Sequence, residues 1–167
     1  PLGRRSQMSR TDTVVSVMTV TLPHEWAKTH AERSPEAPAV VFDGSMLSYA
    51  ELDRRAEAHG RKLRNAGIGE GDLVAVDAVS TIETVVALVG THRSRAVAVP
   101  RGPNTVDTGV WIDPAAYVVV PTSGSSGSPR GVILTDQNVA AAVEASQRRL
   151  GNGPTDRWLL TLPLFHV

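Results

Sequence analysis

The run from Tyr117 to Thr135, YVVVPTSGSSGSPRGVILT, constrains the fold most, because a loop of small polar residues stands between two apolar strands. β-Branched residues predict these strands at Val118–Val120 and Val132–Leu134. Three glycines follow the first strand, at Gly124, Gly127 and Gly131. Glycine lets the backbone turn and approach a ligand closely, and successive N–H groups of such a loop form a concave anion site. The sequence therefore predicts an anion-binding loop.

Side chains of the loop add donors and a positive charge. Hydroxyl groups stand at Thr122, Ser123, Ser125 and Ser126. Arg130 supplies a fixed charge. A Gly/Ser-rich linker is the alternative for this composition, but the apolar runs that flank the loop tightly favour a binding loop. A Walker A loop is excluded, because no Lys-Ser/Thr pair follows a glycine and a strand follows Gly131.

Residues 122–131, TSGSSGSPRG, resemble the phosphate-loop signature of the adenylate-forming enzymes, T/S-S-G-S/T-T/S-G-x-P-K-G. Two further segments resemble that superfamily in the same order. Leu47–Val76 is similar to its opening helix and strand, and Leu162–Val167, LPLFHV, to the P-L/M-F/Y-H motif of its acyl-CoA synthetase branch. The superfamily also contains the adenylation domains of nonribosomal peptide synthetases and beetle luciferases. The resemblance covers residues 23–167.

The resemblance implies roles for individual residues. The loop residues expected to wrap the β- and γ-phosphates of ATP are Thr122, Ser123, Gly124, Ser125, Ser126 and Gly127. Arg130, where the family usually has lysine, is the expected cationic and catalytic partner. His166 is the second catalytic candidate, expected to orient the acyl carboxylate or to shield it from water; the alternative is a histidine with no role. Mg²⁺ is expected with ATP, with no metal ligands in this chain.

The reaction implied by the resemblance has two steps. A carboxylic acid attacks the α-phosphate of ATP to give an acyl-adenylate, and a thiol then displaces AMP. The leading prediction is an AMP-forming acid–thiol ligase of the acyl-CoA ligase type, with coenzyme A as co-substrate. An amino-acid-activating adenylation domain that serves a carrier-protein thiol is the alternative. A third possibility is a non-catalytic, degenerate nucleotide-binding or interaction module.

The expected organisation is an N-terminal extension, residues 1–22, followed by the N-terminal part of an AMP-binding (adenylation) domain, residues 23–167. The residues before Met8, PLGRRSQ (1–7), are interpreted as a cloning remnant. The chain is interpreted as a fragment truncated at its C-terminus and inactive alone. Segment 101–116 is shorter than the corresponding family section, so a trimmed core and a lost section both stay open.

Composition excludes several classes of function. Seventeen basic and seventeen acidic residues leave no net charge to attract nucleic acid or an anionic membrane surface. Without cysteine, the chain has no disulfide and no cysteine-based metal site. No apolar run approaches the roughly 20 residues of a membrane span, so a cytoplasmic location is expected. The oligomeric state is left open.

Alternation of strand and helix signals predicts an α/β fold with a largely parallel sheet flanked by helices. Helix-start patterns stand at Ser48 with Glu51, Ser80 with Glu83, and Thr135 with Asn138. Besides the two strands that flank the loop, strands are expected at 39–42, 73–76, 96–99 (stopped by Pro100) and 158–162, with a hairpin turn at Asp43-Gly44. His59 is expected at the edge of the core, and His92–Arg95 at a solvated helix end. In such a fold, ligands bind at the carboxyl ends of the parallel strands.

Overall fold

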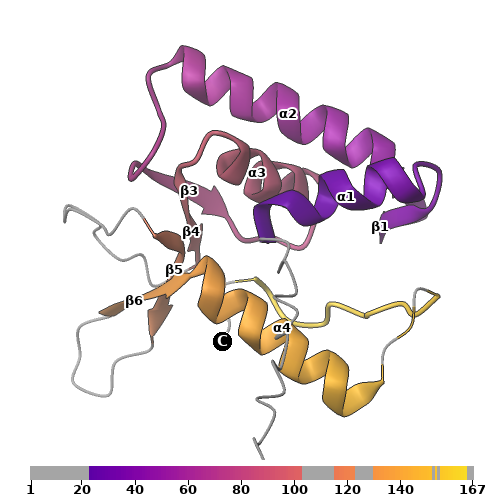
Figure 1. Cartoon of the computed structure of the whole chain (residues 1–167). Coiled ribbons are helices and arrows are strands. Elements are labelled where there is room, and N and C mark those ends of the chain that lie inside the picture. Colours follow the sequence, from indigo (N-terminus) through magenta and orange to yellow (C-terminus); the bar gives the residue numbers. More distant parts are fainter. Residues whose placement is uncertain (1–22, 103–114, 123–129, 152, 154, 165–167) are drawn as a thin grey trace, which may run out of the picture.

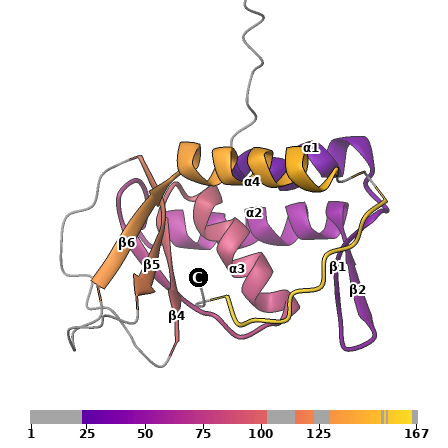
Figure 2. The same cartoon turned by 90° about the horizontal axis from the view of Figure 1, so that it is seen from below.

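The computed structural model describes residues 23–102, 115–122, 130–151, 153 and 155–164 of the 167-residue chain. Its elements in order are the 3-10 helix η1 (Pro23–Glu25), α1 (Trp26–Arg33), β1 (Pro38–Phe42), β2 (Ser45–Ser48), α2 (Tyr49–Asn65), β3 (Leu73–Asp77), α3 (Ile82–Arg93), β4 (Val97–Arg101), β5 (Ala116–Thr122), β6 (Arg130–Thr135) and α4 (Asp136–Leu150). Figures 1 and 2 both place the β3–β6 strands on the left and the β1–β2 hairpin on the right. The predicted α/β fold is confirmed.

The main sheet has the strand order β3-β4-β5-β6. Strands β3, β4 and β5 are parallel, and β6 pairs with β5 in the antiparallel direction. Valines of the two central strands form the buried centre of the sheet: Val97, Val99 and Val119. The carboxyl ends of β3, β4 and β5 therefore share one edge, which is the edge where ligands bind in parallel sheets.

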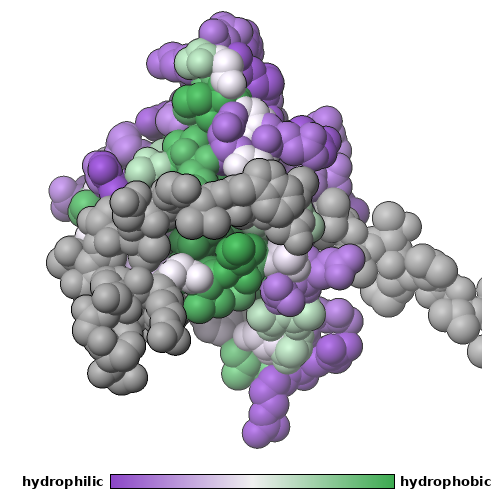
Figure 3. Space-filling view, turned by 90° about the vertical axis from the view of Figure 1, so that its left-hand side faces the viewer, coloured by the Kyte–Doolittle hydropathy of each residue, from purple (hydrophilic) through white to green (hydrophobic). Residues whose placement is uncertain are grey.

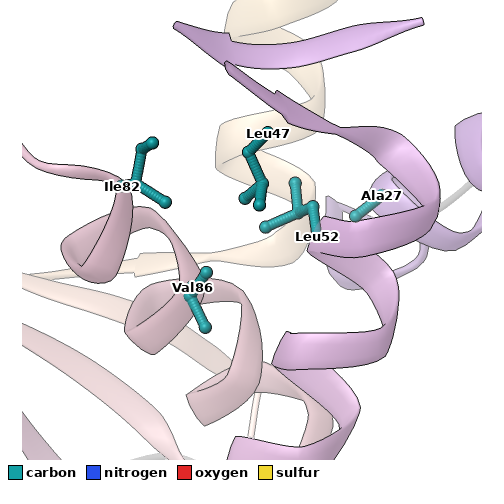
Figure 4. Close-up of a cluster of buried hydrophobic side chains, with 5 residues drawn as sticks. All are labelled: Ala27, Leu47, Leu52, Ile82 and Val86. Carbon is teal, nitrogen blue, oxygen red and sulfur yellow. The ribbon is translucent and has the colours of Figure 1, made fainter. Parts of the chain in front are cut away.

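A second core holds the first three α-helices against the β1–β2 hairpin. Its buried members are Ala27, Leu47, Leu52, Ile82 and Val86. Figure 4 shows Leu47 and Leu52 lying between Ala27 of α1 and the α3 side chains. None of the helices in the described part of the chain combines the length and the apolar character that a membrane span requires.

Two glycines allow α2 and α3 to approach each other closely. A Cβ added at Gly60 would lie 2.8 Å from the carbonyl oxygen of Gly90, and one added at Gly90 would lie 2.9 Å from the carbonyl oxygen of Ala56. Real Cβ atoms do not come this close to backbone oxygens, so either addition would force the helices apart.

Gly90→Ala is expected to lower the free energy of unfolding by about 1–3 kcal/mol through overpacking, even though alanine favours a helix more than glycine does. Urea denaturation measures the change. Gly153→Ala is the matched control, because a Cβ at Gly153 meets nothing within 4 Å. Equal stability of the two variants would show that the helix contact does not need glycine.

The predicted helix starts are confirmed at two places and wrong at one. Ser48 accepts a hydrogen bond from the Glu51 N–H, and Thr135 and Asn138 form a reciprocal capping box. Helix α3 is instead capped by Thr81, whose Oγ1 accepts from the Thr84 N–H at 3.2 Å. Ser80 and Thr81 are neighbours with equivalent hydroxyl groups, so the local pattern could not choose between them.

Two strand predictions are corrected. Strand β4 does not stop before Pro100 but continues to Arg101, since Pro100 is paired with Val76 and the next hydrogen bond, from the Ala78 N–H to the Arg101 carbonyl, is 3.1 Å long. Segment 158–162 is not a strand, and Leu159 is 86% exposed. An apolar run needs a pairing partner to become a strand, and this segment is outside both sheets.

The expectation that His92–Arg95 forms a solvated helix end is also wrong. The His92 side chain is 8% exposed and stacks on Tyr117 of β5, with ring centroids 3.7 Å apart. Ser94 is buried as well, and Arg93 forms an ion pair with Asp53 of α2. The end of α3 is covered because it packs against the start of β5. His59 is half-buried, as expected for the edge of the core.

Candidate functional site

The ends of the predicted phosphate loop lie at the carboxyl edge of the sheet. Strand β5 ends at Thr122, β6 begins at Arg130, and the backbones of these two residues are paired. The predicted loop residues between them, Ser123, Gly124, Ser125, Ser126 and Gly127, lie outside the described residues, as does His166. The structure thus brings the first and last predicted loop residues together through the backbone.

The register of the β5–β6 hairpin is continuous up to the loop. It runs from Val118 opposite Leu134 through Pro121 opposite Gly131 to the final pair. The strand predicted after the loop is confirmed. Its antiparallel direction is new, and it means that one hairpin holds both ends of the segment 123–129 at the same edge as the carboxyl ends of β3 and β4.

An ion pair occupies the same edge on the neighbouring strands. Asp77 ends β3 and Arg101 ends β4, and the two residues are in register. The Nη2 and Nε atoms of Arg101 both donate to Asp77 Oδ1, at 2.7 and 3.2 Å. Counting three residues along both strands from the Ala98–Val118 pair places Arg101 level with Pro121, beside the start of the loop. Arg101 was not predicted from the sequence. The signal would have been a basic residue at the carboxyl end of a strand, but the strand was expected to stop before Pro100, so Arg101 was not recognised as part of it.

The N-terminus of α3 lies near this edge as well, because α3 follows the carboxyl end of β3 after a short turn. The Thr84 Oγ1 donates to the Asp77 carbonyl at 3.1 Å, which ties the first turn of α3 to the end of β3. A helix N-terminus carries partial positive charge. The described groups at this edge that favour an anion are therefore the N-terminus of α3 and the guanidinium of Arg101, which is paired with Asp77.

A cavity of about 280 Å³ lies at the opposite, amino-terminal edge of β4 and β5. Its lining residues are His24, Glu70, His92, Arg95, Ala96, Ala116, Tyr117 and Asp136. Burial lowers the pKa of His92 to about 4 and raises the pKa of Tyr117, so both rings are neutral near pH 7. The stacked pair is therefore packing rather than a charged binding group, and the cavity is separate from the predicted loop. Within the described residues, no group of three or more acidic or histidine side chains is arranged to hold a metal ion.

Comparison with known proteins gives consistent matches. A family model for AMP-binding enzymes matches residues 27–110 and 106–167. A 2-succinylbenzoate–CoA ligase from Oceanobacillus iheyensis is 26% identical over 200 aligned positions, covering 90% of this chain and 41% of the ligase. The chain therefore spans less than half the length of this relative.

Two solved structures share the fold. An o-succinylbenzoate coenzyme A synthetase from Bacillus subtilis, in complex with ATP and a magnesium ion, has a TM-score of 0.74 and 22% identity, covering 84% of this chain and 51% of that one. A nonribosomal peptide synthetase bound to α-methyl-L-serine-AMP has a TM-score of 0.74 and 25% identity, covering 87% of this chain and 21% of that one.

The matches also bear on segment 101–116. The two ranges of the family match meet at residues 106–110, inside this segment. The alignment with the ligase has 200 positions although this chain has only 167 residues, so the ligase contains residues that have no counterpart here. That segment 101–116 is short for the family stays a prediction.

Proposed function

The chain belongs to the AMP-binding enzyme family, and from this premise we propose that the protein containing it activates a carboxylic acid with ATP as an acyl-adenylate and transfers the acyl group to a thiol. One observation carries the proposal. The β5–β6 hairpin holds both ends of the Gly/Ser-rich segment at the carboxyl edge of three parallel strands. A segment with three glycines, several hydroxyl groups and Arg130, placed at that edge, suits a triphosphate.

The proposed roles are those implied by the resemblance to the phosphate-loop and P-L/M-F/Y-H motifs of the adenylate-forming enzymes. The cradle for the β- and γ-phosphates is formed by Thr122, Ser123, Gly124, Ser125, Ser126 and Gly127. Arg130 neutralises the phosphate charge that develops as pyrophosphate leaves, and His166 orients the acyl carboxylate. The synthetase complex with ATP and magnesium supports both ligands. Mg²⁺ is proposed to accompany ATP, and its ligands are not assigned to residues of this chain.

Coenzyme A is the proposed acceptor, because the alignment with the 2-succinylbenzoate–CoA ligase covers 90% of this chain. An adenylation domain that activates an amino acid for a carrier-protein thiol is the second candidate, and it is supported by the likeness to the synthetase bound to an amino-acid adenylate. The two candidates differ in the acid they accept and in whether free coenzyme A releases AMP.

The proposal is tested by ATP–pyrophosphate exchange with the complete protein and a panel of carboxylic and amino acids. Exchange that depends on one acid supports adenylation, and AMP release on adding coenzyme A then assigns the acceptor. Absence of exchange with ATP still bound would identify a non-catalytic nucleotide-binding module instead.

The 167-residue chain by itself is expected to show no exchange, because it spans only 41% of the length of the ligase relative. The same assay on the isolated chain checks this expectation. Acid-dependent formation of labelled ATP by the chain would contradict it.

A further inference from the structure

The Asp77–Arg101 pair at the carboxyl edge has a fixed backbone and an accessible guanidinium. The parallel register pairs Asp77 with Arg101, and the bond from the Ala78 N–H to the Arg101 carbonyl extends the ladder beyond them. The Arg101 side chain is 46% exposed. A cation is thus held at a defined point of the edge while remaining open to a ligand.

The geometry of the pair leaves binding capacity on the arginine. Both bonds go to a single carboxylate oxygen, Asp77 Oδ1, from Nε and Nη2. A guanidinium carries five N–H donors in a planar fork, so this pair does not use three of them. The fork matches the geometry of a phosphate group, and charge-assisted bonds to phosphate are stronger than neutral ones.

The position of Arg101 points to a particular ligand. Extending the register from the Ala98–Val118 pair brings Arg101 level with Pro121 on β5, one residue before Thr122, where the phosphate loop is proposed to begin. Arg130, the cation predicted from the sequence, stands at the other end of the same loop. Two arginines would therefore flank the loop along the edge, one on β4 and one on β6.

We propose that Arg101 is a second phosphate-binding residue of the nucleotide site, positioned by Asp77, and that it contacts the polyphosphate of ATP. This inference rests on the proposed function, because it takes the loop at this edge as the ATP site. Asp77 contributes by holding the guanidinium in place, while Arg101 makes the contact. A surface ion pair of this kind contributes little to stability, so replacing either residue leaves the fold intact.

The test measures the KM values for ATP and for the acid by pyrophosphate exchange in the complete protein. Arg101→Ala is expected to raise the KM for ATP about tenfold, the loss typical of one charge-assisted contact, with less than about a twofold change in the KM for the acid. Arg101→Lys keeps the charge but not the fork, and Asp77→Asn loosens the arginine, so both should give intermediate values. Thermal melting confirms that each variant is folded.

Arg95→Ala is the matched control. Arg95 forms an exposed ion pair with Glu70 at 2.8 Å, but it lies at the amino-terminal edge of the same sheet. Its KM for ATP should equal that of the wild type. If Arg101→Ala behaves like Arg95→Ala, or raises the KM for the acid as much as that for ATP, the proposal is wrong.

Failure of the proposed function can be told apart from failure of this inference. Where the wild-type protein binds ATP without exchange, equilibrium dialysis gives the Kd for ATP, and a tenfold increase in Arg101→Ala alone still supports the inference. Where the wild-type protein binds no ATP, the proposed function and this inference are both wrong.

Discussion

Replacing Arg130 by alanine in the complete protein is expected to raise the KM for ATP about thirtyfold and to leave the KM for the acid nearly unchanged. Arg130 begins β6 directly after the loop, and its backbone is paired with that of Thr122, where the proposed phosphate loop begins. A charge-assisted hydrogen bond to a buried anion contributes about 1.5–3 kcal/mol, which corresponds to roughly 10- to 150-fold in binding. Pyrophosphate exchange at varied ATP and acid concentrations gives both constants.

Arg130→Lys is the informative companion variant, because the family usually has lysine at this point of its signature. It keeps the charge with a different geometry and should recover most of the affinity for ATP. Equal increases in the two KM values for Arg130→Ala would count against a phosphate-specific role. Melting temperatures separate this outcome from a folding defect.

The free energy of unfolding is expected to fall by about 3 kcal/mol between pH 6.5 and pH 4 because of His92. Burial against Tyr117 lowers the pKa of His92 from 6.5 in the unfolded chain to about 4 in the folded protein. Between these values the unfolded state binds the proton and the folded state does not, so stability rises with pH. The contribution is fully present above pH 6.5, is lost as the pH falls, and changes no further below pH 4.

His92→Phe isolates this effect, because phenylalanine keeps a ring against Tyr117 and does not titrate. The measurement is urea denaturation of the wild type and of His92→Phe from pH 4 to pH 8. Subtracting one curve of unfolding free energy against pH from the other cancels the contribution of the carboxylates that both proteins share. His30→Phe is the matched control, since His30 also stacks on a tyrosine, Tyr49, but at the surface. If the pH dependence of the free energy of unfolding persists in His92→Phe, or disappears in His30→Phe, the effect does not come from His92.

The predictions that held depend on residues close together in the sequence. The Thr135–Asn138 box lies within one helical turn, and the strands around the loop were indicated by their own valines. The short loop also contained a signal for the direction of β6. Seven residues, 123–129, can join antiparallel neighbours, whereas a parallel crossover needs about a dozen or more.

The features that were missed depend on contacts between distant residues. The run His92–Arg95 is polar in the sequence, and its first member is buried where α3 packs against Tyr117. Arg101 gains its position from Asp77, 24 residues earlier, through the β3–β4 register. Segment 158–162 is apolar enough for a strand but has no place in the sheets. Local propensity contains no information about such partners.

The β5–β6 hairpin also affects how tightly a ligand can bind. Pairing of Thr122 with Arg130 closes the segment between them when the sheet folds, so the entropy of closure is part of folding and not of ligand association. This entropy grows only with the logarithm of the loop length. Residues inserted into the segment would therefore lower the free energy of unfolding by only roughly 0.6 kcal/mol for each doubling of its length. Length variants of this segment would therefore separate the demands of chain closure from those of phosphate recognition.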